Sequence, residues 1–207
     1  MKGFVTVSEP SSVETVIKKS RFIGQLYPVS SMEEAQERLL CVKKKYWDAR
    51  HSCSAVIIGQ SGEYTRCSDD GEPQGTAGVP MLEALKGSGL TNVLCVVTRY
   101  FGGVLLGAGG LVRAYYSSVS EVCASAKRIT YTPCFLYSLD VPFKLWGRME
   151  GAIYSLGGAF KSIDYAEDIK TLVLITPEAE KGFLSTVQEI SAGKITPVKL
   201  GEEYKIS

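Results

Sequence analysis

Residues 92–116 read NVLCVVTRYFGGVLLGAGGLVRAYY, and this stretch joins the two clearest secondary-structure signals of the chain. Residues 92–101 form a β-branched, apolar run bounded by glycines, which is typical of a strand buried in the middle of a sheet. Leu111, Tyr115 and Val119 then recur at helical spacing, so we expect the longest helix over residues 108–126. The stretch therefore predicts a central strand that leads through a glycine-rich loop into a long helix.

The remaining sequence alternates strands and helices in two different rhythms. Before residue 133, periodicity and turn residues predict further strands at 13–18, 21–29, 52–58 and 128–132 and helices at 32–46 and 76–86. From residue 133 onward the order is strand, helix, strand, strand, helix, strand, at 135–141, 143–156, 159–165, 170–176, 178–191 and 194–200. This βαββαβ order is the split βαβ, ferredoxin-like pattern. We expect an α+β protein with two domains, residues 1–132 and residues 133–207, that meet at Pro133.

The composition is that of a globular protein. The 207 residues are 45% hydrophobic, and 23 basic residues oppose 22 acidic ones. A folded chain of this size buries roughly 70% of its unfolded surface, which excludes a disordered tail or a disulfide mini-protein. No apolar run reaches the roughly 18 residues that span a bilayer, and the start shows no secretory signal. We therefore expect a cytoplasmic protein without a membrane partner, whose six cysteines are reduced and buried rather than zinc ligands.

The charges are spread unevenly along the chain. The first 131 residues carry 15 basic and 12 acidic residues, and the later residues carry 8 basic and 10 acidic ones. A polyanion is therefore expected to bind the first domain, where Lys18, Lys19 and Arg21 are candidate contacts. The run Lys43, Lys44 and Lys45 is a further candidate, and a solvated helix end is its ordinary alternative. The net charge of +1 argues against a protein that is covered by nucleic acid on all sides.

The densest polar cluster is the loop SDDGEPQGT at residues 68–76. Three carboxylates, Asp69, Asp70 and Glu72, fall within four positions, and their repulsion needs a cation such as Mg²⁺ or an arginine. These acids are candidate catalytic or Mg²⁺-binding residues, and no other metal or cofactor is indicated. The alternative is a structural loop in which one acid pairs with an arginine and another caps the following helix.

The second cluster combines two arginines with glycines around the start of the long helix. Arg99 ends the expected central strand, and Arg113 lies near the helix start, whose free N–H groups suit an anion. The candidate loop glycines are Gly102, Gly103, Gly107, Gly109 and Gly110. The spacing matches neither a dinucleotide-binding loop nor a P-loop. Alternatively, the glycines serve close packing of helix on sheet, and Arg99 pairs with the acidic loop.

His51 is the only histidine, and it stands two residues before Cys53. Residues two apart on a strand share a face without necessarily touching, so a thiol nucleophile with a histidine base is not indicated. His51 is a candidate catalytic residue, and a hydrogen-bonded residue at a strand end is the ordinary alternative.

Four blocks of the sequence resemble the IMPACT/YigZ family over essentially the whole chain. The blocks are residues 19–23 (KSRFI), 49–55 (ARHSCSA), 69–78 (DDGEPQGTAG) and 99–107 (RYFGGVLLG). The resemblance implies a first domain similar to domain IV of elongation factor G, with the domain-2-like fold of ribosomal proteins. It implies a second, ferredoxin-like domain similar to domain V of that factor. The family has no established catalytic residue.

Three functions follow as hypotheses. The first is a translation-associated regulator that binds RNA or the ribosome through the glycine-rich, basic face formed by the candidates above. The second is a phosphoester or nucleotide hydrolase, in which the three acids hold Mg²⁺ and Arg99 and Arg113 clamp phosphate. The third is a protein-interaction module without catalysis, whose partner binds the second domain.

Overall fold

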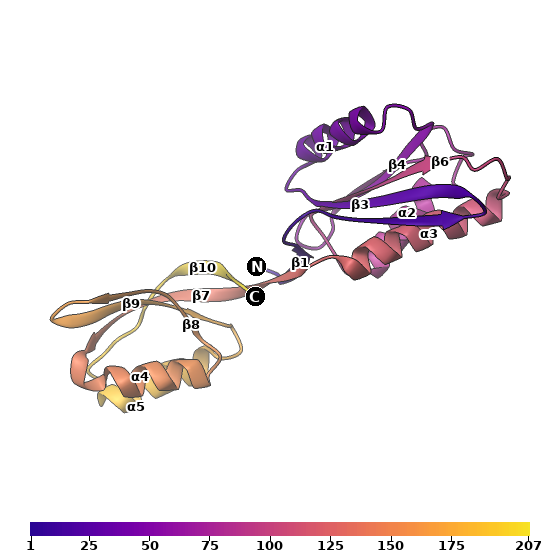
Figure 1. Cartoon of the computed structure of the whole chain (residues 1–207). Coiled ribbons are helices and arrows are strands. Elements are labelled where there is room, and N and C mark those ends of the chain that lie inside the picture. The colour runs from indigo at the N-terminus through magenta and orange to yellow at the C-terminus, as the bar shows by residue number, and fades with distance from the viewer. The chain divides into compact units, whose positions relative to one another are not determined.

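The computed structural model describes residues 1–207 and has a mixed α+β fold with five helices and two antiparallel sheets. The chain separates into two compact units (Figure 1). One unit comprises Phe4–Ile129, and the other comprises Met1–Gly3 together with Thr130–Ser207. The division falls slightly before the boundary expected at residues 132 and 133, and the sequence did not indicate that the first three residues join the second unit.

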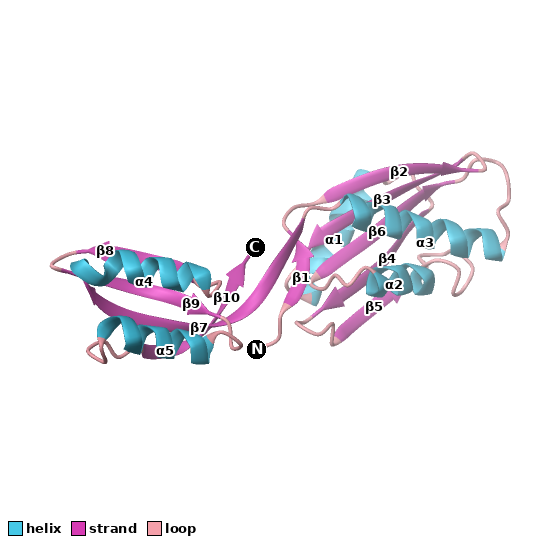
Figure 2. Cartoon of the chain, turned by 90° about the horizontal axis from the view of Figure 1, so that it is seen from below, coloured by secondary structure: helices cyan, strands magenta, loops and turns pink.

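The first unit contains six strands and three helices, and all strands except β1 form one five-stranded sheet. Its strands are β1 (Phe4–Val7), β2 (Ser11–Ile17), β3 (Ser20–Pro28), β4 (His51–Ile58), β5 (Tyr64–Ser68) and β6 (Val93–Tyr100). Its helices are α1 (Met32–Lys45), α2 (Gly78–Gly87) and α3 (Ala108–Ser125). The sheet has the order β2-β3-β6-β4-β5, so the run predicted to be the central strand is central (Figure 2).

Helices cover both faces of this sheet. Helices α2 and α3 lie on one face and α1 on the other (Figure 1). The larger core cluster lies under α2 and α3, and the predicted helical face of α3 supplies Leu111, Tyr115 and Val119 to it. A smaller cluster, with Ala35 and Val42, lies under α1. Strands β4 and β6 are therefore buried on both faces, which explains their continuous apolar runs.

The second unit has the predicted βαββαβ order. Its elements are β7 (Arg128–Pro142), α4 (Phe143–Ser155), β8 (Ala159–Tyr165), β9 (Asp168–Ile175), α5 (Glu180–Ser191) and β10 (Val198–Ile206). The strands pair antiparallel in the order β10-β7-β9-β8. Helices α4 and α5 lie on one face of the sheet (Figure 1) and contribute Trp146, Met149 and Phe183 to the core.

Three strand predictions need correction. The strands expected at 128–132 and 135–141 are one continuous strand, β7, in which Pro133 lies opposite Tyr204 of β10. Proline removes one hydrogen-bond donor, but its φ angle is compatible with extended backbone, so it does not end the strand. The last strand, expected at 194–200, extends over Val198–Ile206. Strands β1 and β5 were not predicted, since both are short and β5 is largely exposed.

None of the helices is long and apolar enough to cross a membrane.

Candidate functional site

A buried ion pair joins the acidic loop to the end of the central strand. The Nη1 atom of Arg99 donates to Oε1 of Glu72 at 2.7 Å, and the hydroxyl of Tyr115 in α3 donates to the same oxygen at 2.8 Å. Arg99 and Glu72 are only 7% and 8% exposed. Burial, reinforced by the neighbouring Cys53 and Glu72, raises the pKa of Tyr115, so its hydroxyl stays protonated and serves as a donor. The predicted pairing of Arg99 with the acidic loop is confirmed.

Asp69 caps helix α2. Its carboxylate accepts hydrogen bonds from the backbone N–H groups of Gly75 at 2.9 Å, Ala77 at 3.0 Å and Gly78 at 2.8 Å. Partial burial opposes ionisation, but these three bonds outweigh it and lower the pKa of Asp69. The alternative in which one acid caps the following helix is therefore correct for Asp69.

Asp70 is also bound by protein groups. It accepts from Nζ of Lys43 at 2.5 Å and from the backbone N–H of Ser52 at 2.7 Å. Its backbone has a φ of +43°, which turns the loop so that the three acids bind different partners. No group of three or more His, Cys, Asp or Glu side chains is placed to hold a metal ion. The geometry required for a Mg²⁺ clamp of Asp69, Asp70 and Glu72 is absent.

His51 is fixed by the acidic loop. It lies opposite Arg99 in the pairing of β4 with β6, and its Nδ1 atom is 2.9 Å from the carbonyl oxygen of Asp70. A carbonyl oxygen only accepts, so Nδ1 carries a proton, and in the neutral form of the ring Nε2 is then an acceptor. Cys53 donates its thiol to the carbonyl of Asp69, and burial raises its pKa to about 12. A thiolate nucleophile at Cys53 is therefore not available near neutral pH.

The glycine loop after β6 holds the turn between β2 and β3. This two-residue turn consists of Lys18 and Lys19, with φ angles of +47° and +67°, and both lysines are exposed. A Cβ atom at Gly102 would overlap the backbone of Lys19, so only glycine allows this close approach. The N–H of Gly102 donates to Oγ of Ser20 at 3.2 Å, which ties the loop to the start of β3. The contact places two lysines beside the loop.

The remaining predicted residues of this region are exposed or paired. Gly103 and Gly107 have φ angles of +80° and +72°, and Gly107 is the N-cap of α3. Gly109 and Gly110 lie in the first turn of α3, and exposed Arg113 follows in the next turn. Arg21 forms a two-bond ion pair with Glu14 at 2.9 and 3.1 Å, and its guanidinium lies 5.3 Å from the ring centre of Tyr100.

A small pocket opens beside the buried ion pair. It has a volume of about 190 Å³ and is lined by Arg50, His51, Arg99, Phe101 and Leu105. Phe101 is 49% exposed and Leu105 is 83% exposed, although both are apolar. We call these five residues the arginine pocket. Arg50 was not singled out as a site residue from the sequence, although it lies in the block 49–55 that carries the family resemblance.

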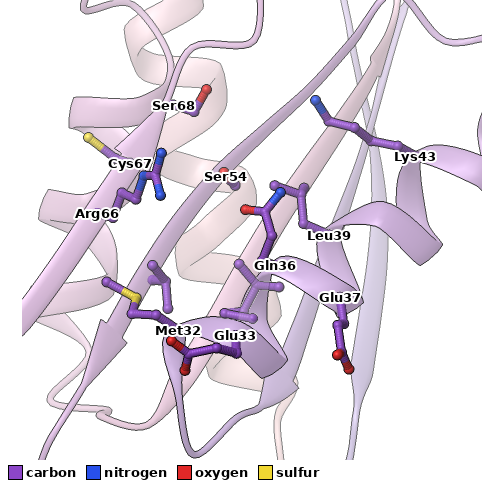
Figure 3. A pocket seen from close by; sticks show the side chains of 13 residues that line it. Met32, Glu33, Gln36, Glu37, Leu39, Lys43, Ser54, Arg66, Cys67 and Ser68 are labelled. Atoms are coloured by element: carbon purple, nitrogen blue, oxygen red, sulfur yellow. The ribbon is translucent and has the colours of Figure 1, made fainter.

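A larger groove lies on the other side of the sheet, between α1 and β5. It has a volume of about 700 Å³, and Figure 3 shows Glu33, Gln36 and Lys43 of α1 and Arg66 and Cys67 of β5 among its lining side chains. Of the residues predicted to contact a polyanion, Lys43 lines it, and its Nζ atom is paired with Asp70. Acidic and basic side chains are both present, so the groove offers no uniform charge to a ligand.

Comparisons with known proteins give a family model for the first unit and relatives that match nearly the whole chain. The family model described as the Impact N-terminal domain matches residues 18–123. The IMPACT family member YvyE of Bacillus subtilis is 39% identical over 98% of this chain and 93% of its own length. The IMPACT family member YigZ of Escherichia coli is 33% identical over 98% of this chain and 100% of its own length.

A solved structure supports the same assignment. The crystal structure of a hypothetical protein is 32% identical, matches 96% of this chain and 97% of its own, and superposes with a TM-score of 0.61. Together with the family model and the two curated relatives, this likeness extends over both units of the fold. The chain belongs to the IMPACT family.

Proposed function

We propose that this protein binds single-stranded RNA, free or within the ribosome, through one face of the first unit. This face is formed by the turn of Lys18 and Lys19 (the lysine turn), the loop of residues 102–107 (the glycine loop) and the arginine pocket. In this proposal it acts as a translation-associated regulator in the cytoplasm, without a catalytic step. The family resemblance of the sequence implies units similar to domains IV and V of elongation factor G, and this expectation motivates the proposal. Fold analogy alone is a weak argument for function, so the proposal rests on the site.

The observation that carries the proposal is the packing of the lysine turn on Gly102. This contact holds two exposed lysines next to the exposed ring of Phe101. Proteins that bind single-stranded nucleic acid combine cations that contact phosphates with aromatic rings on which bases stack. The turn and the loop bring these two elements together.

The ion pairs separate the cations that are free to bind phosphate from those that are not. Arg21 is paired with Glu14, and Arg99 is buried against Glu72. Lys18, Lys19, Arg50 and Arg113 take part in none of the ion pairs of the structure. We therefore assign the phosphate contacts to Lys18, Lys19 and Arg113, and we give Arg50 and Arg99 the role of lining the pocket.

The glycines of the loop leave the backbone N–H groups at the start of α3 accessible to a ligand. The first turn of α3 contains exposed Ala108 and Gly109 and no acidic residue, and its N-cap makes no side-chain hydrogen bond. Its N–H groups are thus open to a phosphate of the same strand, and the helix dipole favours negative charge there.

The test compares one RNA sequence as a single strand and as a duplex, by fluorescence anisotropy with the full chain. We expect the single strand to bind more tightly, because only an unpaired base can stack on Phe101. Its affinity should fall steeply between about 50 and 200 mM salt. No binding of either RNA at the lower salt, or equal binding of both, would contradict the proposal.

A further inference from the structure

We propose that the arginine pocket binds one unpaired nucleobase that carries a keto oxygen beside a ring N–H, namely uracil or guanine. This inference rests on the proposed RNA binding and adds base selectivity to it. It is carried by the size of the pocket, by its apolar and aromatic wall, and by the hydrogen-bonding groups that line it.

The size of the pocket limits its ligand to one ring. Pockets for drug-sized molecules are about 300–1,000 Å³, whereas this pocket has about 190 Å³. A whole nucleotide with its sugar and phosphate is too large to be enclosed. A single base fits, with its sugar and phosphate outside the pocket.

Only one of the two arginines of the pocket carries a charge that no carboxylate balances, and the walls of the pocket suit a planar group. Arg99 is neutralised by Glu72 at 2.7 Å, so Arg50 is the only arginine of the pocket without a carboxylate partner. The guanidinium of Arg99 lies 5.7 Å from the ring centre of Phe101, which gives the pocket a planar cation beside an aromatic ring. Aromatic rings and guanidinium planes are the surfaces on which unstacked bases bind.

Arg99 also has a donor without a partner. Its Nε atom is buried and makes no hydrogen bond to the protein, although its Nη1 and Nη2 atoms are bound to Glu72 and Ser20. A buried donor without an acceptor costs about 1–3 kcal/mol, so such atoms are rare. Because Nε has almost no exposed surface, a ligand in the pocket does not reach it, and Arg50 is the donor available there to a keto oxygen.

The remaining groups select the edge of the base. Arg50 offers only donors, and Nε2 of neutral His51 is an acceptor because Nδ1 donates to Asp70. A keto oxygen needs a donor, and the adjacent ring N–H needs an acceptor. Uracil and guanine present this pair on their Watson–Crick edges. Cytosine and adenine present the opposite pair, an amino donor beside a ring acceptor.

The test compares oligouridine with oligocytidine of about eight nucleotides, a length within the usual site size for single strands. Both are pyrimidines with the same backbone, so their affinities differ through the base edge. We expect the full chain to bind oligouridine about tenfold more tightly, the effect of one good hydrogen-bonded base contact.

Two arginine variants separate selectivity from phosphate binding. Arg50→Ala should remove most of the preference for oligouridine. Arg113→Ala, an equal loss of charge outside the pocket, should weaken the binding of both oligonucleotides and leave the preference unchanged.

Two phenylalanine variants test stacking. Phe101→Ala should weaken the binding of both oligonucleotides by about tenfold through lost stacking. Phe143→Ala, which changes an exposed phenylalanine of the other unit, should weaken the binding of neither oligonucleotide.

Photocrosslinking gives a readout that needs no variant. An oligouridine with one 4-thiouridine should crosslink to the tryptic peptide of residues 100–113, which contains Phe101 and Leu105. Equal affinities for the two oligonucleotides, a preference for cytidine, or a crosslink confined to peptides without a residue of the pocket would overturn the pocket assignment while leaving RNA binding in place. Absence of binding to both would instead refute the proposed function.

Discussion

Arg99 and Glu72 form a buried ion pair between the end of the central strand and the acidic loop, with Nη1 of Arg99 2.7 Å from Oε1 of Glu72. The pair connects three elements, because Tyr115 of α3 donates to the same carboxylate oxygen. The site is thus organised around a pair that is enclosed by protein. The exposed residues beside it, Phe101 and Arg50, are the ones available to a ligand.

We expect Glu72→Gln to destabilise the first unit by about 3–5 kcal/mol. The amide can still accept from Tyr115, but it leaves the buried guanidinium of Arg99 without a counter-charge. The double variant Glu72→Gln with Arg99→Met removes this charge and should be more stable than the single variant. Denaturant unfolding measures both. A double variant that is as unstable as the sum of the two single changes would contradict the pairing.

The cap of α2 should make stability depend on pH. Asp69→Asn keeps one acceptor oxygen but loses the other, so we expect a loss of about 1 kcal/mol at pH 7. The folded-state pKa of Asp69 is lowered, so the carboxylate stabilises the fold above its unfolded pKa of about 4. This contribution is lost as the pH falls through the folded pKa. Denaturant unfolding of both proteins should show a difference that shrinks below about pH 4, and a constant difference would exclude the ionised cap.

Gly102→Ala should destabilise the lysine turn, because the added methyl group overlaps the backbone of Lys19. We expect a loss of about 1–3 kcal/mol, as for overpacking elsewhere in folded proteins. Gly109→Ala is the matched control, since its Cβ would lie at an ordinary distance of 3.7 Å from Arg113. Thermal unfolding compares the two. Equal stabilities of the two variants would show that the loop does not hold the turn.

The cysteines should differ in reactivity by position. The expectation that all six cysteines are buried is wrong for Cys41, which is exposed, and for Cys67, which is partly exposed. Cys53 is buried, and burial raises its pKa to about 12. Alkylation of the native protein near pH 8, followed by mass spectrometry, should modify Cys41 and leave Cys53 unmodified until the protein unfolds. The unfolded protein is the control for labelling efficiency. Native labelling of Cys53 at the rate of Cys41 would contradict its burial.

The sequence predicted the regular elements better than the composition of the site. Strand β6 and helix α3 were predictable because their apolar residues follow one period over many positions, and the pairing of Arg99 was predictable because the acidic loop needs a cation. Exposed β5 has no such apolar pattern. The arginine pocket was not predictable, since strand pairing brings His51 opposite Arg99 although 47 residues separate them in the chain.

The central claim is that the exposed lysines of the turn contact phosphates. Lys18→Asn with Lys19→Gly tests it, because both charges are lost while asparagine and glycine suit the positive φ angles of this two-residue turn. Lys44→Ala with Lys45→Ala removes the same charge from exposed positions at the end of α1 and serves as the control.

The measurement is the affinity for single-stranded RNA between about 50 and 200 mM salt. We predict that the turn variant is folded, binds more weakly, and has a slope of log affinity against log salt that is shallower by about 1.4, or about 0.7 for each lost phosphate contact. The control should keep the wild-type slope. An unchanged slope in the turn variant, or the same change in both variants, would contradict RNA binding through this face.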